Sequence, residues 1–347
     1  ERREINESKA AVLGTELTRG PWKFWAEGGL GRASEDKPDT LSSSAFTADL
    51  TGLGYGDTMK PLPTAAPGLN DASKYAFNKA KIEKSLATDR VRHLKADVQR
   101  ELEVAGWDLD LKAGLKASRR DKDNEQETYA PSAKALKKAP YNLTSSQLGL
   151  ANVVSVEAVD YPWTSFGPGI DTGKLRGLFA PYDLNGFRDA VASVVNDFGM
   201  KERVDAGYLQ AQVEQGGTQW LVGLRHERVR FTADGTSSTD GKVAPVHAES
   251  SSRHWLPALL LKQQLGADTA LRAALTNSVV RPAFGQLTPG LTVDGDEATV
   301  GNPLLKPLRS RNLDLGVERR LGRDGAVSAY VFHKKIRDFA FQTDLAG

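Results

Sequence analysis

The stretch of sequence that decides the fold lies between residues 281 and 332. Residues 281–290 read RPAFGQLTPG, residues 301–307 read GNPLLKP, and residues 309–318 read RSRNLDLGVE. The first two runs are rich in proline and glycine, as loops are. In the third run, polar and apolar side chains alternate strictly: Asn312, Asp314 and Glu318 against Leu313, Leu315 and Val317. This period of two predicts a β-strand with one apolar and one charged face, followed by a turn at 322–325 and a second strand at 326–332.

The same alternation recurs earlier in the chain. In its clearest instance the residues of one face are Trp107, Leu109, Leu111, Ala113 and Leu115, and those of the other are Asp108, Asp110, Lys112 and Lys116. Charges without partners are very costly to bury in a soluble core. A sheet that lines a water-filled or plug-filled lumen explains these charges better.

Tight turns and long connections follow one another along the chain. Tight turns are expected at 19–21, 103–106, 216–217, 266–268 and 322–325, and long connections at about 34–88, 118–202 and 281–308. Helices are expected at 71–86 and 184–198, where the sequence is rich in helix-forming residues. These turns and connections together predict about ten antiparallel strands arranged in hairpins. Outer-membrane barrels have short turns on one side and long loops on the other.

Three tryptophans support a membrane barrel. Trp22, Trp107 and Trp220 each follow a tight turn by one to three residues, as an aromatic girdle at one interface requires. Tryptophans also open strands in soluble sheets, so a soluble β-protein stays open as an alternative.

Composition limits the function further. The chain has 347 residues, of which 39% are hydrophobic and 26% charged, and no apolar run of about 18 residues predicts a membrane-spanning helix. A net charge of +2 gives no reason to expect a nucleic-acid partner. The absence of cysteine excludes disulfides and thiolate metal sites.

The opening stretch also resembles a known family. TonB-dependent outer-membrane receptors carry a run of the form RPsFgqLsPG…GNPdLkPe before late barrel strands. The matching residues here are Arg281, Pro282, Phe284, Gly301, Asn302, Pro303, Lys306 and Pro307. Residues 253–262 (RHWLPALLLK) and 271–284 (LRAALTNSVVRPAF) are similar to further family segments, and the motif-bearing resemblance covers about 203–339.

The resemblance implies an all-β fold, a segment of an antiparallel transmembrane β-barrel with short helices in its loops. It implies a location in the outer membrane of a Gram-negative bacterium, contact with outer-membrane lipid, and import of a small-molecule ligand. In the full-length protein it implies a plug domain and the TonB–ExbB–ExbD complex as partners. No enzymatic activity and no cofactor are expected.

Two departures from the family pattern indicate that the chain corresponds to only part of a family member. Nothing before the first strands corresponds to a plug domain, and residues 1–6 (ERREIN) lack the apolar core of a signal peptide. Family barrels have 22 strands, whereas about ten are expected here. We therefore expect residues 1–347 to be an internal part of a barrel, with no plug domain.

Alternation assigns a facing to each strand residue. The residues expected to face the lumen are Asp108, Asp110, Lys112, Arg272, Asp314 and Glu318. Those expected to face lipid are Leu109, Leu111, Leu271, Leu313 and Leu315.

No catalytic or metal site is expected. The five histidines show no HExxH-like spacing. The acidic run at 121–125 lacks the glycine and the closing glutamate of a calcium loop, and a solvated run of charges explains both it and the second acidic run at 294–297 better than a calcium site does. The loop aromatics Tyr161, Trp163, Phe166, Phe179 and Tyr182 could stack on a sugar ring or a flat ligand, or could instead pack the loop on itself.

The ligand expected from the resemblance is an oligosaccharide, with an iron–siderophore complex as the rival. Two other classes of protein stay open. One is a passive outer-membrane porin; the other is a soluble glycan-binding β-protein.

Overall fold

The computed structural model describes residues 2–56, 63–64, 66–156, 167–239, 241–288, 291–294 and 297–341. The chain divides into two compact units. The first unit comprises residues 1–6, 35–86 and 125–196, and the second comprises 7–34, 87–124 and 197–347.

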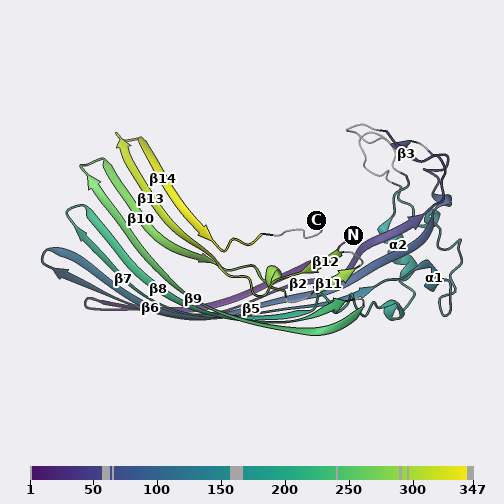
Figure 1. Cartoon of the computed structure of the whole chain (residues 1–347), viewed down its shortest axis with the longest axis horizontal. Coiled ribbons are helices and arrows are strands. Elements are labelled where there is room, and N and C mark those ends of the chain that lie inside the picture. Colours follow the sequence, from purple (N-terminus) through teal and green to yellow (C-terminus); the bar gives the residue numbers. More distant parts are fainter. Residues whose placement is uncertain are drawn as a thin grey trace. The chain divides into compact units, whose positions relative to one another are not determined.

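Ten long strands form the main sheet (Figure 1). They are β1 (Ile5–Arg19), β2 (Trp22–Thr47), β5 (Ala76–Val104), β6 (Trp107–Tyr129), β7 (Phe198–Gln215), β8 (Thr218–Thr239), β9 (Lys242–Leu265), β10 (Thr269–Val280), β13 (Leu308–Leu321) and β14 (Gly325–Arg337). Each strand is hydrogen-bonded to the next one in this order, so the sheet is a meander. The prediction of about ten antiparallel strands is confirmed.

Short elements occupy the connections. The small strands are β3 (Gly54–Tyr55), β4 (Pro63–Thr64), β11 (Leu291–Asp294) and β12 (Glu297–Val300). The helices are η1 (Ala72–Lys74), α1 (Ala133–Leu136), η2 (Leu150–Asn152), α2 (Thr172–Phe179), η3 (Leu184–Phe187) and η4 (Phe284–Leu287). Among the described residues, no helix is both long and apolar enough to cross a membrane.

All five predicted tight turns are present between consecutive strands. The turn between β7 and β8 consists of Gly216 and Gly217, with φ of 56° and 83°. Two consecutive positive φ angles define the two-residue turn whose twist matches a β-hairpin, and glycine adopts them without a steric penalty.

The two predicted longer helices are wrong. Residues 76–86 belong to β5, and of residues 184–198 only 184–187 are helical, as a single 3-10 turn. In β5, Phe77, Ala80 and Ile82 are buried by side chains of the first unit, so tertiary packing overrides the helical propensity of the lysines and alanines.

The strands are also longer than predicted, which shortens the loops. β2 continues to Thr47 and β6 to Tyr129, so the connections span 48–75 and 130–197 rather than 34–88 and 118–202. Ion pairs hold the charged extension of β6 to its neighbour: Arg120 pairs with Asp89, and Arg90 with Asp123. The third connection, 281–307, matches its predicted span.

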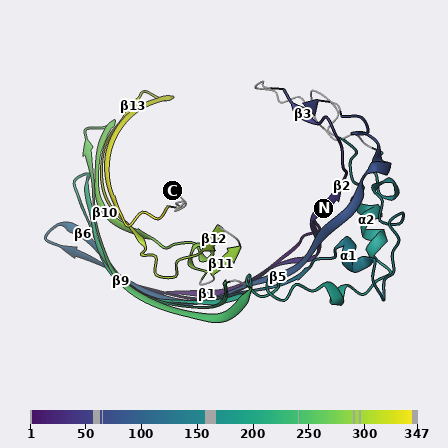
Figure 2. The same cartoon turned by 45° about the vertical axis from the view of Figure 1, so that its right-hand side comes forward.

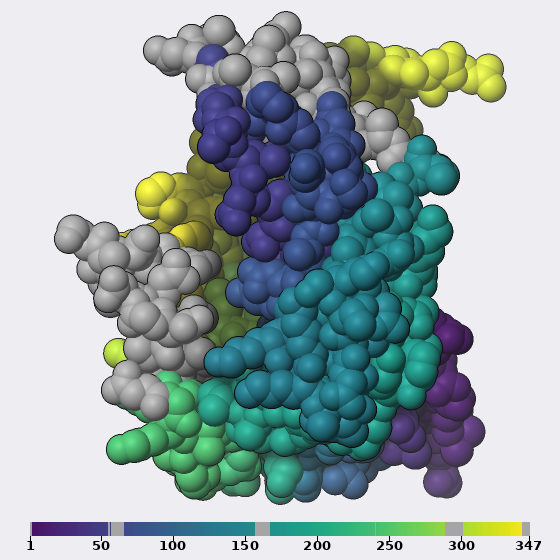
Figure 3. All heavy atoms as spheres, turned by 90° about the vertical axis from the view of Figure 1, so that its right-hand side faces the viewer, coloured from purple at the N-terminus to yellow at the C-terminus, as the bar shows by residue number. Residues whose placement is uncertain are grey.

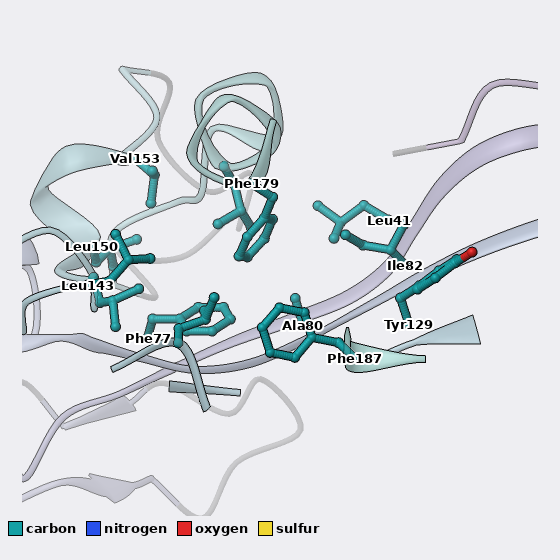
Figure 4. Packing of buried hydrophobic residues seen from close by; sticks show 13 residues of the cluster. Leu41, Phe77, Ala80, Ile82, Tyr129, Leu143, Leu150, Val153, Phe179 and Phe187 are labelled. Carbon is teal, nitrogen blue, oxygen red and sulfur yellow. The ribbon is translucent and has the colours of Figure 1, made fainter. Parts of the chain in front are cut away.

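The first unit has its own hydrophobic cluster, built from strand extensions and loop residues (Figure 4). Phe77 from β5 packs edge to face against Phe179 from α2, with ring centroids 5.7 Å apart. Backbone hydrogen bonds join the loop to the strand, for example from Phe77 N to Leu148 O at 2.9 Å. In Figure 3 the described loop residues 130–156 and 167–196, in teal, lie against residues 76–86 of β5, in blue.

The β8–β9 hairpin extends well past the apolar part of the sheet. His247 lies on this extension, with its Nδ1 2.7 Å from Asp234 and its Nε2 3.2 Å from Glu249. Hydrogen bonds that the imidazole donates to these two carboxylates raise the pKa of His247 above its usual value. The protonated imidazole is therefore favoured at this end of the hairpin.

Candidate functional site

The strand register sorts the side chains of the second unit onto two faces. Directly opposed residues share a face of a sheet, and one row of them is apolar across six strands. It runs through Leu111, Ala211, Val222, Leu259, Leu275 and Leu313. We call the face that carries this row the apolar face.

The apolar face is broad and exposed. Leu209 and Leu224 oppose each other on it, as do Leu315 and Val331. Leu209 exposes 69% of its surface and Val331 exposes 72%. A contiguous apolar surface of this size marks contact with a membrane or with another protein.

The opposite, polar face carries the charged residues. All six residues predicted to face the lumen lie on it: Asp108, Asp110, Lys112, Arg272, Asp314 and Glu318. Arg272 Nε lies 3.0 Å from Glu318 Oε1, and Lys112 Nζ lies 4.7 Å from the centre of the Trp25 ring. The five leucines predicted to face lipid, Leu109, Leu111, Leu271, Leu313 and Leu315, lie on the apolar face.

Glycines on the polar face make room for tyrosine rings. Tyr208 is the register partner of Gly114, and its hydroxyl donates a hydrogen bond of 2.7 Å to Asp97. A Cβ atom at Gly114 would lie 2.0 Å from Asp97 Oδ1 and 2.5 Å from the Tyr208 ring. Gly316 accommodates Tyr330 in the same way, and the Tyr330 hydroxyl donates to Glu318. Each glycine therefore fixes an aromatic ring and a carboxylate across strands.

Loop 281–307 begins with an anchor on the polar face. Arg281 bridges two carboxylates, with its Nε 3.2 Å from Glu202 and its Nη1 3.3 Å from Glu227. Glu227 is buried, and Arg225 also pairs with it at 2.7 Å. Because a buried charge needs partners, the two arginines stabilise Glu227 while Arg281 holds the loop.

Apolar packing reinforces this anchor. Phe284 and Leu287 of η4 pack with Met200, Phe231 and Ala233. The guanidinium of Arg120 lies 4.6 Å from the centre of the Phe284 ring, on its face. Figure 2 shows β11 and β12 of the same loop inside the curve formed by β9, β10 and β13, so the polar face is the concave one in this unit.

The second part of the motif, residues 301–307, joins the end of the loop to η4. A Cβ atom at Gly301 would lie 2.4 Å from Thr288 O, so only glycine fits there without a shift. Asn302 N donates to Gln286 O at 2.8 Å, and the Asn302 side chain accepts a hydrogen bond from Leu304 N. Pro282 lies between Arg281 and η4, Pro303 follows Asn302 in the turn, and Lys306 and Pro307 lead into β13. Contacts within the loop or with the polar face thus involve Arg281, Phe284, Gly301 and Asn302 from both parts of the motif, which the sequence alone did not reveal.

The predicted loop aromatics are placed only in part. Tyr161, Trp163 and Phe166 lie outside the described residues. Phe179 is buried in the cluster of the first unit, and Tyr182 packs against that cluster and against Tyr141, with ring centroids 5.7 Å apart. The Phe179 ring packs against the Phe77 ring of β5 inside this cluster.

Comparison with known proteins identifies relatives of this arrangement. The family model described as TonB dependent receptor-like, beta-barrel matches residues 27–347. Among curated protein sequences, none matches.

Several solved structures share the fold. The ferric-catecholate import receptor Fiu from K12 E. coli, in its closed form, is 11% identical with a TM-score of 0.60, over 100% of this chain and 43% of that one. The siderophore receptor PiuA from Acinetobacter baumannii is 9% identical with a TM-score of 0.54, over 95% and 40%. The ferric citrate transporter FecA is 15% identical with a TM-score of 0.53, over 99% and 37%. This chain thus spans about two fifths of the length of these proteins.

Proposed function

This chain belongs to the TonB-dependent receptors, as part of their β-barrel, and from that premise we propose that it forms the wall of a pathway for active ligand uptake. TonB-dependent receptors are outer-membrane transporters of Gram-negative bacteria and not enzymes. The observation that carries the proposal is the division of the sheet into an exposed apolar face and a concave polar face with an anchored loop.

In this proposal the apolar face contacts lipid and the polar face lines the interior. On β6 the apolar side chains extend from Trp107 to Ala117. Ten residue steps of about 3.3 Å give about 33 Å, and a strand tilt of about 40° reduces this to a height of about 25 Å. That height equals the apolar band of a transmembrane barrel.

The polar face would contact a plug domain or water in the complete receptor. Its ion pairs, such as Arg272–Glu318, need a hydrated or polar neighbour to satisfy their remaining hydrogen-bonding capacity. The tight turns would lie on the periplasmic side and the long loops on the extracellular side. TonB–ExbB–ExbD would supply energy from the proton-motive force.

Energised uptake distinguishes this function from a passive porin. Cells that make the receptor from its complete gene should accumulate ligand, and a protonophore or deletion of TonB should abolish accumulation. Uptake that continues at the same rate after either treatment would refute active transport.

For the ligand we propose an oligosaccharide, with recognition by the loop aromatics Tyr161, Trp163 and Phe166. A flat aromatic ring stacks well on the apolar face of a sugar, and this contribution of roughly 0.5–1.5 kcal/mol corresponds to about a two- to tenfold change in affinity. Calorimetry with a panel of oligosaccharides should show this two- to tenfold loss of affinity for Trp163→Ala. Trp107→Ala, which changes a residue next to the tight turn between β5 and β6, should bind with unchanged affinity. Unchanged affinity in Trp163→Ala would contradict this recognition.

An iron–siderophore complex is the second candidate. The names of Fiu, PiuA and FecA state that those proteins handle ferric-catecholate, a siderophore and ferric citrate. Binding of ferric siderophores, together with no binding across the oligosaccharide panel, would decide for iron uptake.

A further inference from the structure

One row of side chains on the polar face is apolar in its middle. From β7 to β13 the directly opposed residues of this row are Gln212, Leu221, Leu260, Ala274 and Asp314. They alternate with the leucines of the apolar face and therefore lie on the concave side of the sheet (Figure 2). Leu260 exposes 38% of its surface there. Lipid does not reach this face in the proposed barrel, so another molecule or water covers the leucine.

The apolar residues of this row form the floor of a pocket of about 280 Å³. The next row toward the tight turns contributes Gln219, Lys262 and Tyr330 to the rim of the pocket. We call this the wall pocket. Its volume lies at the lower limit of small-molecule sites, which is roughly 300 Å³. The wall pocket therefore accommodates a single ring-sized unit rather than a large ligand.

Three polar side chains of the wall pocket have no partner within the part of the chain that the structure describes. Gln212, Lys262 and Asp314 form neither a side-chain hydrogen bond nor an ion pair there. Arg272, which also lines the pocket, is by contrast paired with Glu318. The three side chains offer a charged donor, a charged acceptor and an amide that both donates and accepts. They are therefore available to a ligand that has hydrogen-bonding groups of both kinds.

An aromatic ring completes the wall pocket. Tyr330 opposes Gly316, where a Cβ atom would lie 2.2 Å from the ring, and the Tyr330 hydroxyl donates to Glu318. The side chain is thus held at both ends, yet it exposes 54% of its surface. A ring that is already fixed loses little conformational freedom when a ligand packs against it.

We propose that the wall pocket binds one sugar unit of the imported oligosaccharide, an inference that rests on the proposed function. A pyranose ring has an apolar face of C–H groups and a rim of hydroxyl groups. Its apolar face fits the leucine floor and the Tyr330 ring. Its hydroxyls, which both donate and accept, match the unpartnered side chains of Gln212, Lys262 and Asp314.

The chemistry of the wall pocket favours a sugar over an apolar side chain of the plug domain. Such a side chain would cover Leu221 and Leu260 but would leave the ammonium of Lys262 and the carboxylate of Asp314 without partners. Desolvating charged groups without partners is costly. Leu221 lies three residues after the start of β8, close to the tight turns. The wall pocket would therefore bind the sugar near the periplasmic end of the pathway, just before release.

The test detects the sugar at the wall pocket in the receptor made from its complete gene. A photo-crosslinking p-benzoylphenylalanine replaces Gln219 on the rim, and cells receive radiolabelled maltohexaose, cellohexaose or xylohexaose. Gln212→Ala/Asp314→Ala removes two hydrogen-bonding side chains from the pocket. The matched control, Gln210→Ala/Asp108→Ala, makes the same changes on the polar face outside the pocket. Capture is measured on protonophore-treated cells, and crosslinked sugar on respiring cells.

The receptor with the crosslinker alone should form a sugar adduct in respiring cells. The pocket variant should lower the adduct yield at least about tenfold, because it loses two hydrogen bonds, one of them to a charged group. The control should keep the full yield. Capture should be unchanged in both variants, which also shows that both are folded.

Two results would overturn the inference alone: equal adduct yields in both variants, or a crosslink to the receptor's own plug domain with no sugar adduct. A receptor that captures none of the three hexasaccharides would instead overturn the proposed oligosaccharide uptake.

Discussion

Replacing Leu111 by lysine tests the facing of the sheet most directly. Leu111 lies on the apolar face, opposite Ala211, and exposes 42% of its surface. It is four residue steps from Trp107, which corresponds to about 10 Å of height in an apolar band of about 25 Å. The new ammonium group would therefore lie near the middle of the membrane.

A lysine at that depth costs about 2–4 kcal/mol. The ratio of folded to unfolded protein should fall roughly 30- to 900-fold, since about 1.4 kcal/mol corresponds to a factor of ten. Guanidinium unfolding in phospholipid vesicles, followed by tryptophan fluorescence, measures this loss. The amount of assembled receptor in the outer membrane should fall with it.

The matched control introduces the same residue at the same level on the other face. Gln212 opposes Asp110, whose Oδ1 atom is buried and has no hydrogen-bond partner among the described residues. Gln212→Lys places an ammonium group next to this carboxylate, so stability should change by less than about 0.5 kcal/mol. Equal destabilisation by both lysines would refute the assignment of the faces.

Three further predictions concern the loop anchor, a strand contact and the hairpin extension. Phe284→Ala should lose about 3 kcal/mol and make loop 281–307 sensitive to limited proteolysis, whereas Leu304→Ala, at an exposed position, should not. Gly114→Ala should destabilise the receptor by about 1–3 kcal/mol through overpacking, whereas Gly177→Ala, with open space around it in α2, should be neutral or stabilising in the same unfolding assay. His247 should titrate by NMR above its usual pKa, so its stabilising contribution is present below about pH 6.5 and is lost as the pH rises through the pKa of the folded state. Resistance of the Phe284→Ala loop to proteolysis would contradict the packing of η4. An unchanged stability of Gly114→Ala would contradict the close contact with Tyr208 and Asp97. A pKa of His247 at its usual value would contradict its hydrogen bonds to Asp234 and Glu249.

The hairpins could be predicted from sequence because two independent signals coincide in them. Leu109, Leu111 and Ala113 repeat with the period of a strand, and glycine-containing turns such as Gly216–Gly217 mark where each strand reverses. A shift of register by one residue would move every leucine to the polar face, so the pattern also specifies the pairing.

The strand extensions could not be predicted in the same way. Residues 118–127 (SRRDKDNEQE) have no apolar alternation, yet they continue β6, because salt bridges such as Arg120–Asp89 replace apolar pairing there. Residues 76–86 have good helical propensity, but burial of Phe77 and Ile82 favours a strand.

The contacts that anchor loop 281–307 show which part of the site could not be predicted from the sequence. The resemblance marked Arg281 and Phe284 as motif residues, but their partners Glu202, Glu227 and Met200 lie more than fifty positions away in the sequence. Nothing local in the chain connects these positions. Only the register of β7 and β8 brings them together.

The separate hydrophobic cluster of the first unit has a consequence for how such receptors diversify. Because residues such as Leu136, Leu175 and Phe179 pack among themselves and against strand extensions, the loop module carries its own stability. New surface residues can then arise on it without disturbing the rows of leucine on the apolar face of the second unit. Evolution, or an engineer who grafts loops between receptors, can change what is captured while leaving the assembly of the barrel intact.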